Sequence, residues 1–173
     1  MRAWTSCMLR PIAMLIIVCI TSVAPAQGQT LKERLVGTWK LVSATSLVGG
    51  AEEPGPLGKT TGLLTYSADG YMCANQMGLD RPKFATPDFR GGSVQEKALA
   101  FESFVGYCGR YEVNEEERSV VHSVVTSWYP NWTGTTQKRF VEVMGDRIKL
   151  TTPPFLSNGK EVIGVIVWER ATK

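Results

Sequence analysis

The sequence contains few of the residue types from which catalytic and metal sites are built. Its 173 residues include one histidine and four cysteines, and neither a CxxC nor an HExxH pattern occurs. The chain also lacks a Gly-x-Ser-x-Gly elbow, a phosphate-binding loop and a dinucleotide fingerprint, and no pair of carboxylates stands out as an acid–base couple. We therefore expect no metal ion and no cofactor, since both need such clusters or loops.

The N-terminal segment has the pattern of a secretory signal peptide. Arg2 and Arg10 occur without an acidic residue, an apolar run of about ten residues follows, and residues 24–26 read Ala-Pro-Ala. The apolar run is too short to span a bilayer, and an uncleaved membrane anchor is the alternative. We predict a signal peptide over residues 1–26, a mature domain over 27–173, and a periplasmic or secreted location without stable membrane insertion.

The mature domain has almost no net charge. The full chain carries +3 at pH 7, and removal of Arg2 and Arg10 leaves +1. Such a domain lacks the basic surface with which proteins bind nucleic acid or anionic membranes, so neither partner is expected. About 147 residues remain, which is enough for one domain with its own hydrophobic core.

Two cysteines remain after removal of the signal peptide. Cys73 and Cys108 both lie in segments with a strand pattern. In an oxidising compartment they either form a disulfide or stay as two buried thiols, and the sequence leaves both alternatives open.

Turn signals divide the mature chain into eight strand-like segments. Asp69-Gly70 between the apolar runs "GLLTY" and "YMCANQ" is typical of a hairpin. Residues 49–62 are rich in glycine and proline and are predicted to form a long loop, and "PPFLSNGKE" is predicted to lead into the last strand. One helix is predicted over residues 94–104, where Ser93 and Glu96 have the spacing of a capping box. Strands joined mostly in sequence favour an antiparallel barrel or a sandwich.

Several segments resemble lipocalins and related calycin barrels. Gly37-Thr38-Trp39 is similar to the Gly-x-Trp that opens the first strand of these proteins, and "VWER" ends the last predicted strand at Arg170. The segments "GLLTYSADGYM", "YCGRYEV", "PNWTGT" and "LTTPP" are similar in content and order to the bacterial and fungal lipocalin-like domain family. The match covers about residues 34–171.

The resemblance implies an all-β fold, an eight-stranded antiparallel barrel with one short helix between strands 3 and 4. It also implies that Trp39 packs at the closed end of the barrel against Arg170, with Gly37 allowing the chain to cross beneath. The alternative is a Trp39 in an ordinary core and an exposed Arg170. No catalytic role is general to this family, so the resemblance predicts fold rather than activity.

Strand alternation selects candidate residues for the barrel interior. The segment 119–128 carries its larger side chains on one face, which we assign inward: Val120, His122, Val124, Thr126 and Trp128. His122 is then a proton shuttle, a polar anchor for a ligand, or a structural residue bonded to a neighbour.

Two further segments leave alternatives open. In 106–113, Tyr107 and Tyr111 share one face, while Cys108 and Arg110 share the other, and either face could point inward if a bulge intervenes. Trp132, in a predicted turn, covers a ligand at the barrel mouth or folds onto its aromatic neighbours.

Three functional hypotheses follow, and the first is favoured. The protein binds a small hydrophobic or amphipathic molecule in its barrel. The predicted contacts are His122 as polar anchor, with Tyr107, Tyr111, Val124, Trp128, Trp132, Phe140 and Ile166 around it. The second hypothesis is an isomerase, cyclase or dehydratase in which His122 acts as general acid–base, helped by Tyr111 or Arg110. The third is a barrel filled by its own side chains.

Overall fold

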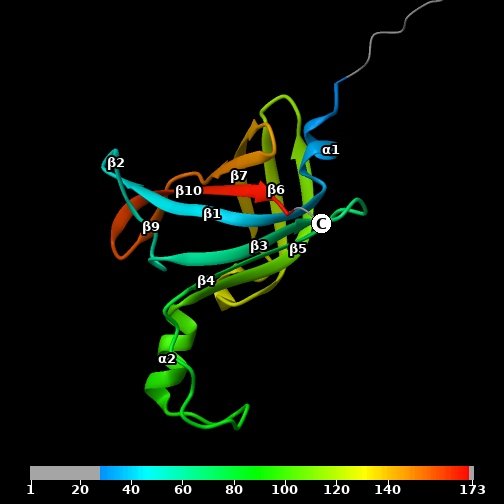
Figure 1. The fold of residues 1–173 in the computed structure, drawn as a ribbon. Coiled ribbons are helices and arrows are strands. Elements are labelled where there is room, and N and C mark those ends of the chain that lie inside the picture. Colours follow the sequence, from blue (N-terminus) through cyan, green and yellow to red (C-terminus); the bar gives the residue numbers. More distant parts are fainter. Residues whose placement is uncertain (1–27, 172–173) are drawn as a thin grey trace, which may run out of the picture.

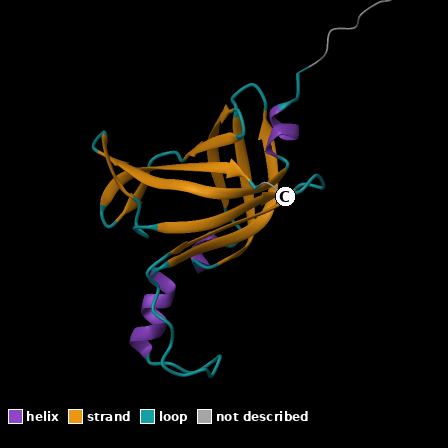
Figure 2. Cartoon of the chain, viewed as in Figure 1, coloured by secondary structure: helices purple, strands orange, loops and turns teal. Residues whose placement is uncertain are grey.

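Eight strands close into an antiparallel barrel in the computed structural model (Figures 1 and 2), which describes residues 28–171. The predicted signal peptide lies outside this range. In order around the barrel, the strands are β1 (Gly37–Val48), β3 (Thr60–Tyr66), β4 (Tyr71–Gly78), β5 (Phe104–Asn114), β6 (Ser119–Ser127), β7 (Thr136–Met144), β8 (Arg147–Thr151) and β10 (Lys160–Arg170). Pairing of β1 with β10 closes the sheet, so the predicted eight-stranded barrel is confirmed.

Two short strands occur where the sequence predicts loops. β2 (Ala51–Pro54) pairs with the second half of β1, and β9 (Phe155–Ser157) pairs with the start of β10. β1 and β10 are longer than the stretches that pair with β3 and β8, so their outer ends leave backbone groups free. The returning chain takes up these hydrogen bonds. β2 corrects the prediction of one long loop over residues 49–62, and β9 is a strand within the segment predicted to lead into the last strand.

The helices lie outside the barrel wall. α1 (Leu31–Leu35) and the end of β10 lie at one end of the barrel, while β2 and β9 lie at the other (Figure 1). α2 (Val94–Glu102) follows β4, as predicted, and both helices begin with a capping box. α2 ends two residues before the predicted limit, projects away from the barrel and buries none of its residues. Among the described residues, no helix is both long and apolar enough to cross a membrane.

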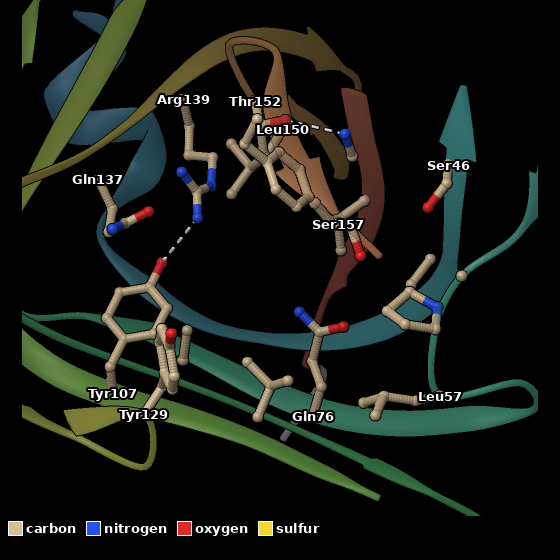
Figure 3. A pocket seen from close by; sticks show the side chains of 18 of the residues that line it. Ser46, Leu57, Gln76, Tyr107, Tyr129, Gln137, Arg139, Leu150, Thr152 and Ser157 are labelled. Atoms are coloured by element: carbon tan, nitrogen blue, oxygen red, sulfur yellow. Dashed lines mark hydrogen bonds between the residues drawn. The ribbon is translucent and has the colours of Figure 1, made fainter. Parts of the chain in front are cut away.

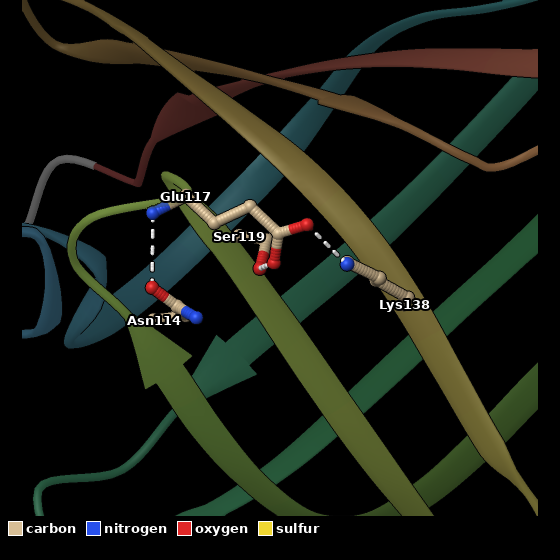
Figure 4. Close-up of polar contacts among 4 residues, drawn as sticks. All are labelled: Asn114, Glu117, Ser119 and Lys138. Carbon is tan, nitrogen blue, oxygen red and sulfur yellow. Dashed lines mark hydrogen bonds and ion pairs between the residues drawn. The ribbon is translucent and has the colours of Figure 1, made fainter.

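Side chains of the β5–β6 turn form hydrogen bonds with α1 and an ion pair with β7. The carboxylate of Glu115 accepts hydrogen bonds from the first backbone N–H groups of α1, at 2.8 and 3.0 Å. Glu117 pairs with Lys138 of β7 and accepts a hydrogen bond from the hydroxyl of Ser119, and its own backbone N–H donates to Asn114 (Figure 4). These contacts link the turn to α1 and to β7.

Trp39 closes the barrel at the α1 end. Its side chain is 1% exposed, and its indole N–H donates to the Leu35 carbonyl at 2.8 Å. The guanidinium carbon of Arg170 lies 4.2 Å from the centroid of the indole ring, which is cation–π geometry. The pair implied by the family resemblance is therefore present.

Gly37 makes room for that arginine. Its φ of +130° is a conformation that residues with a Cβ rarely adopt, and an added Cβ would lie 2.6 Å from Nη1 of Arg170. The same guanidinium donates to the carbonyls of Arg34 and Val36 at the end of α1, at 2.7 and 2.9 Å. The glycine thus allows Arg170 to join α1 to the barrel floor.

Cys73 and Cys108 form a disulfide, which decides between the two alternatives left by the sequence. The cysteines are directly opposite each other on β4 and β5, with Cα atoms 4.1 Å apart. Between these strands the chain leaves the barrel to form α2 and its flanking loop. The disulfide therefore holds together two strands that no tight turn connects.

Candidate functional site

The barrel contains a cavity of about 800 Å³ that opens among the loops of the β2–β9 end (Figure 3). This volume is within the range of about 300–1,000 Å³ that is usual for small-molecule sites. It contradicts the hypothesis of a barrel filled by its own side chains. Apolar wall comes from Leu64, Ala74, Leu150, Ile166 and Trp168.

A chain of four buried polar side chains crosses one side of the cavity. The hydroxyl of Tyr66 lies 2.8 Å from Nε2 of His122, and the hydroxyl of Tyr107 lies 2.9 Å from Nδ1. Nη2 of Arg139 donates to the Tyr107 oxygen at 3.5 Å. The four side chains come from four strands. Tyr66 is the last residue of β3, Tyr107 lies on β5, His122 on β6 and Arg139 on β7.

Burial determines the direction of these hydrogen bonds. A neutral imidazole has one N–H donor and one acceptor nitrogen. Among the described residues, Tyr66 has His122 Nε2 as the one hydrogen-bond partner of its hydroxyl, and a buried hydroxyl proton without an acceptor is costly. We infer that Tyr66 donates to Nε2, so that Nδ1–H donates to Tyr107. Because the Tyr107 oxygen already accepts from His122 and Arg139, its own O–H group is available to donate to a molecule in the cavity that it lines.

The same burial holds His122 in its neutral form. The imidazole is 1% exposed, and loss of hydration, reinforced by the nearby positive charge of Arg139, lowers its pKa from 6.5 to about 3. Burial also raises the pKa of Tyr66 well above its usual value. At neutral pH these groups therefore act as uncharged hydrogen-bonding partners.

Aromatic side chains surround the mouth of the cavity. Trp132, in the short 3₁₀ helix η1 (Pro130–Trp132), packs edge-on against Tyr107, Trp128 and Tyr129, with ring centroids 5.6–6.0 Å apart. Trp128 donates from its indole N–H to the Phe101 carbonyl of α2 at 2.8 Å. Trp132 therefore packs on its aromatic neighbours. It also belongs to the lining of the cavity, and its role as a cover over a ligand stays a prediction.

A bulge settles which faces of β5 and β6 point inward. The pairing shifts between Cys108 and Gly109, so Val120, His122 and Val124 are buried as predicted, whereas Thr126 is exposed. A side chain at Gly109 would overlap the Ser123 carbonyl, so this position needs glycine. The extra residue reverses the alternation before Thr126, which corrects its predicted inward position.

The tyrosine face of β5 is the inward one, and the face that carries Arg110 points outward. Tyr107 and Tyr111 are buried, while the guanidinium of Arg110 lies outside, 4.5 Å from the Tyr71 ring. Arg110 therefore cannot assist His122, which corrects its candidacy. The hydroxyl of Tyr111 donates to the Ser67 carbonyl at 2.8 Å, so its proton is already engaged at the closed end.

Some predicted contacts lie beside the cavity rather than in it. His122, Tyr107, Trp128, Trp132 and Ile166 belong to its lining. Tyr111 and Val124 are buried in the surrounding core instead. Contact with a ligand stays a prediction for the lining residues.

Phe140 does not line the cavity, so its predicted contact with a ligand is wrong. Arg139, which was not predicted, lines the cavity instead. Phe140 is 41% exposed on the outer face of β7, with the Lys138 ammonium over its ring. Arg139 and Val141 take the inward positions on this strand. Strand alternation could have found this, because the face with Phe140 also carries Lys138 and Glu142, whereas the other carries a single charge.

Comparisons with known proteins identify the family of this chain. A family model described as a lipocalin-like domain matches residues 36–171. The 4'-hydroxy-3'-methoxypropiophenone carrier protein of Aspergillus oryzae (strain ATCC 42149 / RIB 40) is 34% identical over 106 residues, which cover 57% of this chain and 96% of that protein. A solved structure of the siderocalin Ex-FABP is 10% identical, with a TM-score of 0.31 over 80% of this chain and 74% of that one.

Proposed function

The chain belongs to the lipocalin-like domain family, and from this premise we propose that it is a carrier for one small aromatic or amphipathic molecule. The observation that carries the proposal is the cavity of about 800 Å³ inside the barrel, open at an aromatic mouth. An eight-stranded barrel is wide enough for one small ligand. The cavity combines apolar wall with a few converging polar groups, as small-molecule sites commonly do.

The polar groups suit a ligand with a hydrogen-bond acceptor. The Tyr107 O–H group is available to donate to a molecule in the cavity, and Trp132 provides an aromatic surface above it. The related carrier from Aspergillus oryzae is named for a propiophenone, which has an aromatic ring and a ketone oxygen. A molecule with these two features would stack on the mouth residues and accept a hydrogen bond from Tyr107.

The arrangement around His122 supports binding rather than acid–base catalysis. A general base needs a pKa near the working pH and reach to the substrate. Both ring nitrogens of His122 are occupied by tyrosines, and its pKa is about 3. Its proposed helpers, Arg110 and the Tyr111 hydroxyl, point elsewhere.

We also propose that the carrier acts outside the cytoplasm, in the periplasm or as a secreted protein. The signal-peptide pattern of residues 1–26 motivates this location. The Cys73–Cys108 disulfide is consistent with it, because such bonds persist in oxidising compartments. Expression with the native N-terminus, followed by fractionation and intact-mass analysis, tests both export and cleavage after Ala26.

Titration calorimetry with 4'-hydroxy-3'-methoxypropiophenone tests the binding proposal. We expect one molecule to bind per chain. Tyr107→Phe should weaken binding about 5- to 10-fold, since it removes one neutral hydrogen bond worth about 1 kcal/mol. Phe140→Leu, on the outer face, is the matched control and should leave the affinity unchanged. A protein that binds neither this ketone nor the apolar probe N-phenyl-1-naphthylamine would contradict the proposal.

A further inference from the structure

Arg139 is a buried cation inside the cavity without a counter-ion. Its side chain is 9% exposed and points into the cavity beside Tyr107 (Figure 3). Its hydrogen bonds go to the Lys138 carbonyl, at 2.7 Å, and to the Tyr107 hydroxyl, at 3.5 Å. Both acceptors are neutral, so no acidic side chain compensates the positive charge of the guanidinium.

No carboxylate of the described residues forms an ion pair with Arg139. The ion pairs of residues 28–171 are Lys138–Glu117, Arg147–Glu169 and Lys149–Glu142, all with partly exposed side chains. One carboxylate borders the cavity, that of Glu102 at the end of α2, and it is exposed and makes no ion pair with Arg139. Burying a charge without a partner costs several kcal/mol, so this arrangement calls for an anion from outside the chain.

A second donor in the same cavity also lacks an acceptor. Trp168 lines the cavity and is 2% exposed, and its indole N–H is the one buried side-chain polar atom of the described residues without a hydrogen-bond partner. Buried donors are almost always paired. Two buried donor groups of the cavity lining therefore lack a full set of partners within the protein: the guanidinium of Arg139 has no anion, and the indole N–H of Trp168 has no acceptor.

We propose that the carried molecule is an anion, an aromatic compound whose carboxylate or other oxyanion pairs with Arg139. This rests on the proposed carrier function and specifies its ligand class. The planar guanidinium offers a fork of N–H donors that matches an oxyanion. The proton of Tyr107 is a neighbouring donor, because His122 and Arg139 already occupy its oxygen. The rest of the molecule would occupy the apolar wall and the aromatic mouth.

Two fluorescent probes that share one aromatic frame test whether the site prefers a negatively charged ligand. 8-Anilinonaphthalene-1-sulfonate carries an oxyanion, and N-phenyl-1-naphthylamine is the same frame without it. Both are titrated into the wild-type protein, Arg139→Met and Arg139→Lys. We expect Arg139→Met to weaken sulfonate binding about 10- to 100-fold, the range for a charge-assisted hydrogen bond, and Arg139→Lys to restore part of it. Binding of the neutral probe should change less than about twofold.

The matched control removes a cation from the outer surface. Arg147→Met makes the same charge change at an exposed residue paired with Glu169, and it should affect neither probe. Unchanged binding of the neutral probe also shows that the variant barrels are folded. If the neutral probe binds and Arg139→Met leaves sulfonate affinity unchanged, or weakens both probes equally, the anion proposal is overturned while the carrier proposal stands. If the wild type binds neither probe, the anion proposal is overturned. If it also fails to bind 4'-hydroxy-3'-methoxypropiophenone, the carrier proposal fails with it.

Discussion

Trp39→Ala is expected to lower the free energy of unfolding by about 3–5 kcal/mol, the range for removing a buried tryptophan. Three contacts are lost together: the packing of a fully buried indole, its hydrogen bond to the Leu35 carbonyl, and its stacking on Arg170. The indole closes the barrel floor, where the truncated side chain leaves a void that the strands cannot fill. Urea denaturation followed by far-UV circular dichroism measures the loss.

A double-mutant cycle separates the arginine contact from the packing. Arg170→Met removes the cation and also its bonds to the Arg34 and Val36 carbonyls, but these bonds are lost equally in both backgrounds. We expect a coupling of about 0.5–2 kcal/mol between Trp39 and Arg170, as measured for cation–π pairs. If Trp39→Ala lowers the free energy of unfolding by less than about 1 kcal/mol, this residue does not close the barrel floor. A coupling energy of zero would show that the cation–π contact does not stabilise the protein.

The barrel was predictable because its signals are local. Each strand carries its own alternation, and Asp69-Gly70 marks a hairpin without reference to the rest of the chain. The floor pair came from the family resemblance, since nothing local connects Trp39 to a residue 131 positions later. β2 and β9 could not be predicted, because they exist only where β1 and β10 extend beyond their neighbours.

The site was less predictable than the fold because it depends on register. One extra residue in the β5–β6 pairing reverses the side of Thr126. Gly109 is compatible with a bulge at this place, but a glycine alone does not show which strand carries the extra residue. For Phe140 the reason is different: the alternation of its own strand places Arg139 and Val141 inside and Phe140 outside. Tyr66 was missed because its contact with His122 joins residues 56 positions apart.

His122 is expected to make the protein less stable in mild acid. In the unfolded chain its pKa is about 6.5, and in the folded protein burial lowers it to about 3. Between these values the unfolded state binds a proton that the folded state does not, so stability falls as the pH falls. The contribution of neutral His122 to the free energy of unfolding is complete above pH 6.5. Below that pH it decreases by about 1.4 kcal/mol per pH unit, the value for one proton. From pH 7 to pH 5 the expected loss is about 2 kcal/mol.

The comparison between pH 7 and pH 5 isolates this residue, because the sequence contains no other histidine. Glu96 and Glu117 have pKa values lowered by hydrogen bonds, from backbone N–H groups at Glu96 and from the Lys138 side chain at Glu117. Their contribution is lost only at more acidic pH. Urea denaturation of protein without a polyhistidine tag gives the wild-type loss, and His122→Gln, which lacks the titrating group, should lose little between the two pH values. Equal losses in both proteins would mean that carboxylates or the chain termini cause the effect. It would then follow that burial does not keep His122 neutral in the folded protein. The hydrogen-bond directions inferred for Tyr66 and Tyr107 would fail as well, and with them the donation from the Tyr107 hydroxyl to a ligand.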